Sequence, residues 1–406
     1  MSLDGGGPAR AASIRERNER LVLRLIFRKG PLSQSEAAKL TGLKPPTVFR
    51  IFSELERAGL IAADPSRRAE PSERKGRRPQ DYRVVPSAAY AVGVDFWAGS
   101  AAAVVQDFSS RLVASRLASF EDPPDAESAQ AAIETIIREV LAEAGVGSEA
   151  LLGIGVGAPG SVSVDEGVVH FYSRIPGMRG YPLGARLKER FGVPVSVHNN
   201  ASVVAMAEHR YGVASGVGSL FAFLIRSGLG GAYLQGGKAL VDRGRTAFEV
   251  GHLSVDMRGQ PCSCGNSGCL ETYLSEDAFL AAASGFIGTA GGGEGIAALD
   301  RALAEGRPGL EEALAPSLAI ASAAVRNIRR LLAPEAVLFV TRSAALSSRL
   351  AVAASADEDC DDGRFGPPGA PVLAAAYDPL LACRAACDLV YDAFFEGGIS
   401  IAKEEP

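Results

Sequence analysis

Residues 249–271 read EVGHLSVDMRGQPCSCGNSGCLE, in which one histidine precedes three closely spaced cysteines. The candidate metal ligands are His252, Cys262, Cys264 and Cys269. Three thiolates and an imidazole make a tetrahedral set suited to zinc, and Gly265 and Gly268 let the chain turn so that Cys269 can face the other sulfurs. Four protein ligands leave no coordination position open for water, so the pattern predicts a structural zinc. Buried free cysteines are the alternative interpretation.

Outward from this stretch, apolar segments alternate with helical patterns from Ala91 onward. Strands are predicted at residues 91–95, 101–107, 151–156, 193–197, 218–225, 231–234 and 336–340, and helices at residues 126–144 and 316–332. The alternation of the two kinds of segment predicts an α/β architecture for this part of the chain.

The N-terminal segment has a different pattern, with three short helices followed by a hairpin. The predicted elements are helices at residues 14–28, 33–40 and 45–58 and strands at residues 59–61 and 82–85. Ser33 and Glu36 form a capping box at the start of the second helix, and Pro45 suits the first turn of the third. A polar loop at residues 64–80 joins the strands. This order predicts a winged helix-turn-helix, with a small helical bundle of no functional consequence as the alternative.

Positive charge is concentrated in this N-terminal segment. Residues 1–85 contain 18 Lys and Arg against 10 Asp and Glu, a net charge of +8, whereas the remaining residues carry a net −13. A basic head on an acidic body indicates that the head alone contacts a polyanion, although a solvated charged surface has the same composition. In a helix-turn-helix the second helix of the motif reads base edges in the major groove of double-stranded DNA. This predicts base contacts by Lys44, Thr47 and Arg50, of which Arg50 suits bidentate binding to guanine.

The composition and cysteine usage agree with a cytoplasmic protein. Of the 406 residues, 47% are hydrophobic and 22% charged, which is typical of a globular protein with two or three domains. No run approaches the ~18 apolar residues that a membrane span needs, and residues 1–20 lack the apolar core of a signal peptide. Three of the six cysteines lie within residues 262–269, which in the cytosol indicates a metal site rather than disulfides. We therefore expect a cytoplasmic protein without a membrane partner.

The cysteine stretch also belongs to a longer signature. Residues 249–252, 259–265 and 268–271 together resemble the signature of the ROK family of repressors and sugar kinases, and the similarity extends through residues 153–160 (GIGVGAPG), residues 182–207 and the N-terminal head. The resemblance implies two actin-like (ribonuclease H-like) lobes with a sugar in the cleft between them. It implies a winged helix-turn-helix at residues 1–85, a first lobe at residues 86–199 with about 380–406, and a second lobe with the zinc site at residues 200–379.

The family's motifs also imply which residues meet each ligand. The sugar hydroxyls would meet Gly160, Ser161, Ser173, Asn199, Asn200, Glu249, His252 and Glu271. Converging carboxylates and amides suit a polyol, and zinc on one ring nitrogen of His252 would fix the imidazole that faces the sugar. Gly76-Arg77-Arg78-Pro79 resembles the family's wing tip, where Arg77 and Arg78 would enter a narrowed minor groove.

The sequence departs from the family's sugar kinases at the residues that carry catalysis. The kinases have an Asn-Asp pair whose aspartate takes the proton from the attacking hydroxyl, whereas here the pair is Asn199-Asn200, and a neutral amide cannot act as a general base. Asp95 is followed by bulky Phe96 and Trp97 in place of the glycines and threonine of a phosphate loop, which would obstruct the approach of backbone amides to phosphates. We therefore predict no catalytic residues and no enzyme activity.

Of two further nucleotide-binding elements of the family, one is replaced in this sequence and the other is retained. Val340-Thr341-Arg342 replaces the family's glycine-rich adenosine loop, whereas Ser227–Gly231 keeps the form of a phosphate-binding turn. Asn200 can still hydrogen-bond a sugar, so sugar binding is expected to survive without phosphoryl transfer.

These inferences predict a sugar-responsive DNA-binding regulator, in which closure of the lobes around a sugar changes operator binding. A single winged head offers few base contacts, so a homodimer or homotetramer on a pseudo-palindromic operator is expected. Two alternatives stay open at this point: an active ATP-dependent sugar kinase with a fused DNA-binding head, and a regulator that senses a protein partner.

Overall fold

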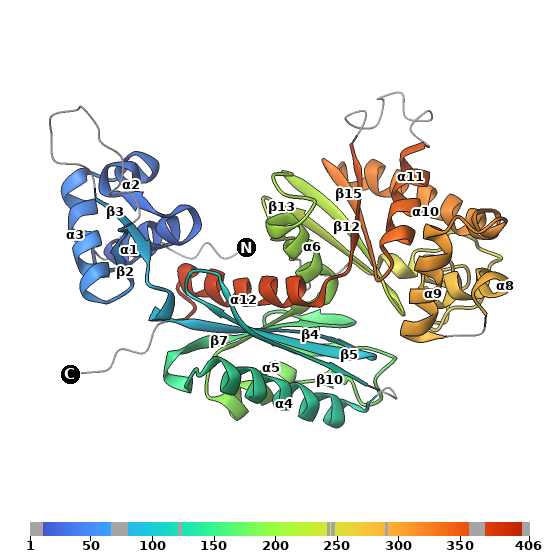
Figure 1. Cartoon of the computed structure of the whole chain (residues 1–406), viewed down its shortest axis with the longest axis horizontal. Helices are drawn as coiled ribbons and strands as arrows, with labels where there is room; N and C mark the ends of the chain where they lie inside the picture. The colour runs from blue at the N-terminus through green and yellow to red at the C-terminus, as the bar shows by residue number, and fades with distance from the viewer. Residues whose placement is uncertain are drawn as a thin grey trace, which may run out of the picture.

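The computed structural model describes residues 11–65, 80–120, 124–241, 244, 248–288, 291–356 and 370–399. Figure 1 shows a small N-terminal head beside two larger α/β lobes. The last helix, α12 (Pro379–Glu396), lies across the sheet of the first lobe, and its C-terminal end reaches the head. Over the described residues, every helix is too short or too polar to span a membrane.

The head has the predicted winged helix-turn-helix pattern. It contains α1 (Ala11–Lys29), α2 (Gln34–Thr41), α3 (Pro45–Arg57) and an antiparallel sheet in the order β1 (Leu32–Ser33), β3 (Asp81–Val84), β2 (Ile61–Ala63). The capping box is confirmed: the Glu36 N–H donates to Ser33 Oγ at 3.3 Å, and the Ser33 N–H donates to Glu36 Oε2 at 2.9 Å. The short strand β1 was not predicted. The wing tip, with Arg77 and Arg78, lies outside the described residues.

The first lobe is built on a five-stranded sheet in the order β11-β7-β4-β5-β6. Its elements are β4 (Tyr90–Trp97), β5 (Ser100–Asp107), β6 (Leu112–Ser119), β7 (Leu151–Ala158), β11 (Val195–Asn199), α4 (Ala126–Ala144), α5 (Leu183–Phe191), the 3₁₀ helices Pro86–Ala88 and Ser148–Ala150, and a small sheet of β8 (Ser161–Ser163), β9 (Val168–Phe171) and β10 (Arg179–Tyr181). Strands β4, β7 and β11 are parallel, and β4, β5 and β6 are antiparallel. Helices α4 and α5 cover one face of this sheet and α12 covers the other (Figure 1).

Two glycines allow α12 to pack directly on the strand backbones. A Cβ atom at Gly93 would lie 1.8 Å from the carbonyl oxygen of Cys383, and one at Gly155 would lie 1.8 Å from that of Ala386. Any side chain at either position would push the helix away from the sheet.

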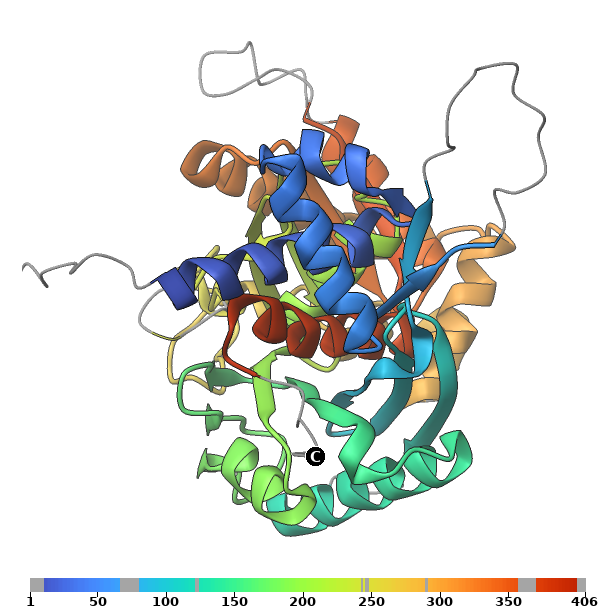
Figure 2. The same cartoon turned by 90° about the vertical axis from the view of Figure 1, so that its left-hand side faces the viewer.

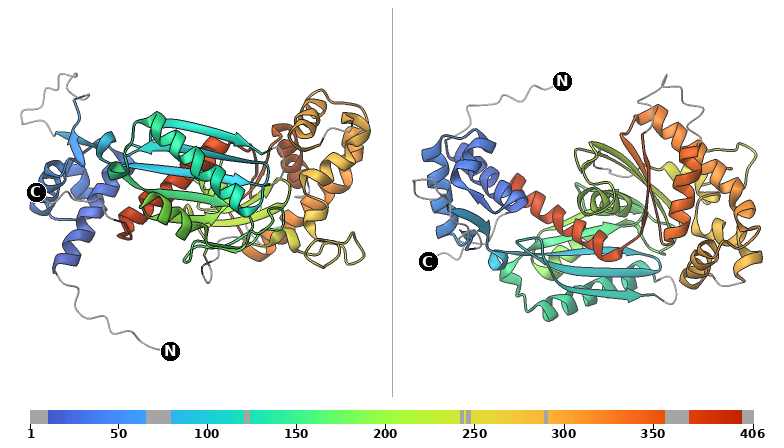
Figure 3. Two further views of the ribbon diagram at one scale, coloured as in Figure 1. Left: turned by 90° about the horizontal axis from the view of Figure 1, so that it is seen from below. Right: turned by 45° about the horizontal axis from the view of Figure 1, so that its top comes forward.

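The second lobe is built on a sheet in the order β14-β13-β12-β15-β16. Its elements are α6 (Asn200–Tyr211), β12 (Ser219–Ile225), β13 (Leu229–Gln235), β14 (Lys238–Ala239), the 3₁₀ helices Val250–His252 and Leu270–Thr272, α7 (Glu276–Ala282), α8 (Ser284–Ile287), α9 (Gly292–Ala304), α10 (Leu310–Leu332), β15 (Ala336–Thr341), α11 (Ala344–Ala356) and β16 (Val372–Ala376). Helices α6 and α12 contact each other between the two sheets (Figure 3). The α/β architecture is therefore confirmed.

The head shares a hydrophobic core with the first lobe. The Phe27 ring of α1 lies 5.1 Å from the rings of Tyr391 and Phe395 on α12, and 5.4 Å from that of Phe108, measured between centroids. Figure 2 shows α1 beside α12 on this side of the molecule. These aromatic side chains therefore join the head and α12 in one hydrophobic core.

Several predicted boundaries differ from those of the structure; the strand predicted at residues 59–61, for example, lies at Ile61–Ala63. The helix predicted from residue 316 begins at Leu310, because Leu310 and Leu314 continue its buried face and Pro316 removes only one backbone hydrogen bond. The strand predicted at residues 193–197 lies at Val195–Asn199, which brings Asn199 to its end.

Candidate sugar pocket and metal cluster

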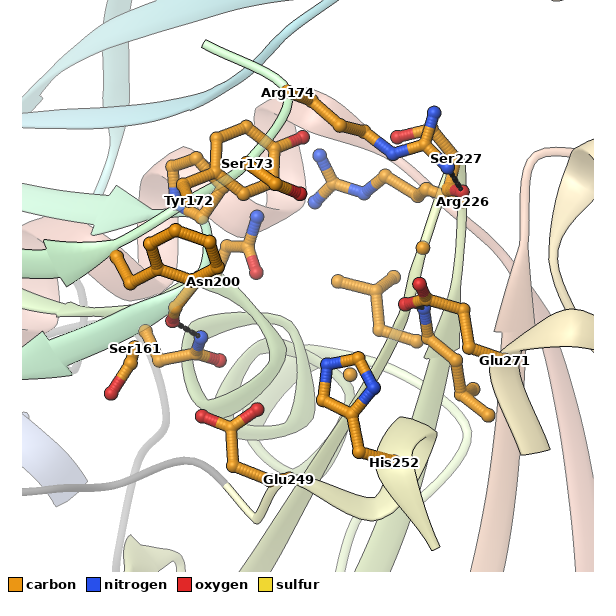
Figure 4. A pocket seen from close by; sticks show the side chains of 18 of the residues that line it. Ser161, Tyr172, Ser173, Arg174, Asn200, Arg226, Ser227, Glu249, His252 and Glu271 are labelled. Carbon is orange, nitrogen blue, oxygen red and sulfur yellow. Dashed lines mark hydrogen bonds between the residues drawn. The ribbon is translucent and has the colours of Figure 1, made fainter. Parts of the chain in front are cut away.

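The residues predicted to bind sugar hydroxyls line one pocket between the two lobes (Figure 4). They are Gly160, Ser161, Ser173, Asn199, Asn200, Glu249, His252 and Glu271. The pocket holds about 950 Å³ of space, part of it open to solvent, within the size range of small-molecule sites. Residues that lie far apart in the sequence therefore meet where the resemblance predicted a ligand.

The first lobe contributes one wall of the pocket through the turn after β7. Gly160 has a φ of 76°, and a Cβ atom there would lie 2.1 Å from the carbonyl oxygen of Phe171. Only glycine permits both this backbone conformation and this close approach. The contact brings Ser161, Tyr172 and Ser173 to the pocket, as Figure 4 shows.

Asn199 and Asn200 lie at the start of α6. The Asn199 side chain caps this helix, since its Oδ1 accepts from the Ala201 N–H at 2.8 Å. Its Nδ2 also donates to the Gly160 carbonyl at 2.6 Å. Asn199 therefore holds the pocket wall against the helix, and Asn200 is the first helical residue, with its amide directed into the pocket in Figure 4.

The second lobe contributes two carboxylates and an imidazole. Glu249 precedes the 3₁₀ helix Val250–His252, and Glu271 lies in the 3₁₀ helix Leu270–Thr272. Figure 4 shows Glu249 and His252 at one end of the pocket and Glu271 at its side, below Ser227. Glu271 Oε2 accepts from the Leu229 N–H at 2.9 Å. This bond occupies a backbone donor of the Ser227–Gly231 turn that a phosphate would otherwise use.

The predicted metal ligands form one cluster beside the pocket. The ligand atoms of His252, Cys262, Cys264 and Cys269 all lie within 4.8 Å of one another. Cys264 Sγ is 3.6 Å from Cys269 Sγ, and Cys262 Sγ is 3.6 Å from His252 Nδ1. Tetrahedral ligands with bonds of about 2.3 Å are separated by about 3.8 Å. The donor set and its spacing therefore fit a metal ion.

The metal loop is held by its own backbone. The Cys262 N–H donates to the Asn266 carbonyl at 2.8 Å, and the Gly265 N–H donates to the Cys262 carbonyl at 3.0 Å. Gly265 has a φ of 94°, and a Cβ atom at Gly268 would lie 1.6 Å from the carbonyl oxygen of Asp256. Both glycines are therefore required for the turn, as the sequence predicted.

A cluster of buried Asp95, buried Arg226 and half-buried Tyr377 borders the pocket at the end of β4. Arg226 Nη2 donates to Asp95 Oδ2 at 3.1 Å, and the Tyr377 hydroxyl donates to the same oxygen at 2.5 Å. The Arg226 guanidinium also lies 4.1 Å from the centroid of the Tyr377 ring. Sequence reasoning missed Arg226 and Tyr377. For Arg226, the sequence offered one signal: a charged residue directly follows the apolar strand that ends at Ile225.

The expected role of Phe96 was wrong. Phe96 is fully buried in the core of the first lobe, because successive residues of β4 face opposite sides of the sheet. Trp97 does line the pocket. The Arg342 guanidinium lies 4.8 Å from the Trp97 ring centroid while it binds Glu276 through two nitrogens, at 2.6 and 2.5 Å.

The recognition helix α3 presents the predicted DNA contacts. Lys44 and Arg50 are exposed and Thr47 is half-buried, while Val48, Ile51, Phe52 and Leu55 form the buried face. Phe49, which sequence reasoning did not select, is 61% exposed on the solvent side of this helix. Arg77 and Arg78 lie outside the described residues, so their contacts stay a prediction.

Comparison with known proteins places the chain in a family. Residues 91–344 match the ROK family, and residues 15–62 match the winged helix-turn-helix DNA-binding family. The chain belongs to the ROK family. The ROK match begins in β4 and ends at the start of α11, so it includes the pocket, the metal cluster and Arg226.

The curated relatives include named repressors. The chain is 26% identical over 267 residues to the xylose repressor of Caldicellulosiruptor bescii, which is 66% of each chain. It is 28% identical over 276 residues to the Escherichia coli DNA-binding transcriptional repressor Mlc, which is 67% of this chain and 66% of Mlc. The matched region thus spans just under two thirds of these relatives.

Solved structures share the fold. A ROK family transcriptional regulator described as a homolog of E. coli Mlc is similar over 95% of this chain and 97% of its own, with a TM-score of 0.76 and 22% identity. A ROK family glucokinase from Streptomyces griseus, in complex with glucose and AMPPNP, is similar over 75% of this chain and all of its own, with a TM-score of 0.65 and 26% identity. The fold thus combines the DNA-binding head with the sugar-kinase-like lobes.

Proposed function

We propose that this chain is a sugar-responsive, DNA-binding transcriptional repressor of carbohydrate uptake or catabolism, whose kinase-like domain binds a sugar without phosphorylating it. One observation carries the proposal. The eight candidate sugar contacts converge in one pocket, in which the amide of Asn200 stands where family kinases have the aspartate base. The repressor names of the relatives and the exposed recognition helix α3 support the DNA-binding part.

The pocket supports binding without catalysis for two reasons. Asn200 cannot take a proton from a sugar hydroxyl, and the absence of a general base typically costs 10²–10⁴-fold in rate. Asp95 is 1% exposed, and its Oδ2 accepts from both Arg226 and Tyr377, so its carboxylate is not open to a metal–phosphate complex. The protein is therefore proposed to be a sensor and not an enzyme.

The metal cluster is proposed to hold a structural zinc ion through His252, Cys262, Cys264 and Cys269. Bound zinc would cross-link the loop at residues 252–269. His252 Nδ1 faces the sulfurs, so Nε2 is the ring nitrogen available to a sugar. The chain itself orients the imidazole through this contact and through the 3₁₀ helix that ends at His252.

The proposed protein has three parts. The DNA-binding head comprises residues 1–85, the first lobe residues 86–199 with about 380–406, and the second lobe residues 200–379. A homodimer or homotetramer would present paired heads to double-stranded operator DNA in the cytoplasm. Lys44, Thr47 and Arg50 are the proposed base contacts in the major groove, and Arg77 and Arg78 those in the minor groove.

The proposal is tested by measuring DNA binding with and without sugar. An operator is first selected from a random duplex library, and its affinity for the zinc-loaded protein is measured by fluorescence anisotropy against a panel of sugars and sugar derivatives. We expect one sugar class to change operator affinity by about 5–150-fold, as is typical of allosteric coupling.

Two variants make this test specific. Glu249→Ala should abolish the sugar effect while it leaves operator affinity intact, because Glu249 lines only the sugar pocket. Glu139→Ala, at an exposed position on α4, is the matched control and should behave as the wild type. Absence of any sugar effect in the wild type would contradict sugar sensing, and failure to select an operator would contradict DNA binding.

A further inference from the structure

Arg226 has hydrogen-bonding capacity that the protein does not use. Its side chain is buried, with 4% of the residue exposed, and it lines the sugar pocket. Nη2 is bound to Asp95, whereas Nε and Nη1 have no hydrogen-bond partner among the described residues. An arginine stays charged at all accessible pH values, and buried N–H groups are normally paired. The unpaired donors therefore indicate a missing acceptor at this end of the pocket.

The carboxylate that pairs with Arg226 is already shared. Asp95 Oδ2 accepts from both Arg226 and the Tyr377 hydroxyl. The flat guanidinium lies against the Tyr377 ring, with 4.1 Å between the guanidinium carbon and the ring centroid, so it is fixed in orientation. A fixed guanidinium with a free edge is preorganised for an oxyanion, which it can bind with two N–H groups.

A second arginine reaches the same end of the pocket from the first lobe. Arg174 donates to the carbonyl of Ser227, in the second lobe, and lies 3.4 Å from Asp277. Figure 4 shows Arg174, Arg226 and Tyr172 together at one end, with the Asn200 amide facing Arg226. Asn199 and Asn200, at the N-terminus of α6, also line the pocket, and a helix N-terminus favours negative charge.

The opposite end of the pocket has the reverse character. Glu249 and His252 lie there, whereas Glu271 lies between the two ends at the Ser227–Gly231 turn, and carboxylates bind neutral hydroxyls but repel anions (Figure 4). A ligand that satisfies both ends must therefore carry hydroxyls on one side and an anionic oxygen group on the other.

We propose that the effector is an anionic sugar, a sugar phosphate or a sugar acid, whose phosphate or carboxylate binds Arg226 and Arg174 while its hydroxyls bind Glu249 and Glu271. This inference rests on the proposed sugar-sensing function and names the class of sugar. Asn200 and the Tyr172 hydroxyl donate further hydrogen bonds to the anion. A phosphate and a carboxylate share the feature that the site requires, which is an oxyanion with at least two acceptor oxygens.

Matched pairs of sugars test the inference by calorimetry on the zinc-loaded full-length protein. Each neutral monosaccharide is compared with its 6-phosphate and with its uronic acid, and inorganic phosphate and ATP are included as separate ligands. We expect one anionic member to bind at least 10-fold more tightly than its neutral parent, with an affinity that falls as salt rises. The phosphate and uronate arms identify which anion the pocket accepts.

Two variants separate the anion contact from folding. Arg174→Gln changes a partly exposed residue and should reduce the affinity for the anionic ligand about 10-fold relative to that for its neutral parent. Arg138→Gln, on the exposed side of α4, is the matched control. Because Arg226→Gln alone leaves the buried Asp95 carboxylate without its cationic partner, it is combined with Asp95→Asn, and the double variant should remove the preference for the anion.

The outcomes distinguish this inference from the function on which it rests. Neutral sugars that bind as tightly as their anionic partners, or an Arg174→Gln variant with unchanged preference, would overturn the anion site and leave sugar sensing intact. No binding by either member of any pair would overturn sugar sensing and the anion site together. Binding of inorganic phosphate or ATP alone, without any sugar preference, would likewise reject an anionic sugar as the effector.

Discussion

Arg28 of the DNA-binding head forms an ion pair with Asp392 of α12, at 2.7 Å between Nη2 and Oδ1. Its other terminal nitrogen lies 3.8 Å from Asp388, one turn earlier on α12. Asp388 is buried and also accepts from Arg210 and Tyr211, both at 2.6 Å, at the C-terminal end of α6. The same helix begins with Asn199 and Asn200 in the pocket. Helix α6 therefore connects the pocket to the head through Asp388.

Weakening this connection should reduce the effect of sugar on DNA binding. Tyr211→Phe removes one hydrogen bond to Asp388 at a cost of about 1 kcal/mol, and it touches neither ligand. We expect the sugar-induced change in operator affinity to shrink several-fold, with operator affinity in the absence of sugar nearly unchanged. Operator titrations with and without sugar measure this ratio. Glu311→Gln, which alters a surface ion pair on α10, is the control, and an unchanged ratio in Tyr211→Phe would argue against α6 as the link.

Arg50 should determine base preference. Arg50→Ala is expected to cost about 1–3 kcal/mol on the selected operator and to relax the preference at one base pair, because arginine binds guanine through two hydrogen bonds. Arg57→Ala, at the exposed C-terminal end of the same helix, should lower affinity less and without a change of preference. Anisotropy titrations with single-base operator variants make the comparison. Equal losses on all sequences would identify Arg50 as a phosphate contact instead.

Removal of the metal should destabilise the second lobe. We expect mass spectrometry to find one zinc per chain in the wild type, and none after chelation or in Cys269→Ser. Loss of the metal should also lower the Tm by several degrees, since ~1 kcal/mol of stability corresponds to about 2–4 °C in a domain of this size. Ser267→Ala changes a non-ligand in the same loop and should keep both the metal and the Tm. A metal-free wild type with an unchanged Tm would contradict the structural role.

Restoring the acidic residue should not restore a kinase. Asn200→Asp replaces the amide by the carboxylate that family kinases have, but Arg226 still binds Asp95 and faces position 200. We expect ADP release with ATP and the effector sugar to stay at the background rate. A rise of 10²-fold or more would show that the missing base was the single defect.

His198 should make stability depend on pH. Burial lowers the pKa of His198 to about 4, compared with about 6.5 in an unfolded chain. Between these values the unfolded state binds more protons, so the stabilising effect of the neutral imidazole is present above pH 6.5 and is lost as the pH falls toward 4. Lowering the pH from 7 to 5 should cost about 2 kcal/mol through this group.

His198→Gln provides the comparison for this effect. Urea unfolding at pH 7 and pH 5 should show a smaller loss of stability in the variant than in the wild type, because the glutamine does not titrate. An identical pH dependence in both proteins would mean that His198 is protonated equally in the folded and unfolded states.

Features that depend on short stretches of chain could be predicted from the sequence. The capping box of Ser33 and Glu36, the proline at the start of α3 and the glycine turns between the cysteines each act within a few residues, so their patterns indicate the local structure. The set of sugar-pocket residues came from the family resemblance and not from such local rules. The structure places them in one pocket, and their contacts with a sugar remain a proposal.

Features that depend on the packing of distant segments were decided only by the tertiary structure. Asp95 is 131 residues from Arg226 and 282 residues from Tyr377. No local pattern indicates that both of these residues donate to the same oxygen of Asp95. The direction of Phe96 likewise depends on which face of β4 meets the core. The sequence by itself determined the head and the glycine turns of the cysteine loop, and the family resemblance added the expected loss of the catalytic base. The tertiary structure decided the unpaired guanidinium in the pocket and the path from α6 to the head, because both arise where separate elements pack together.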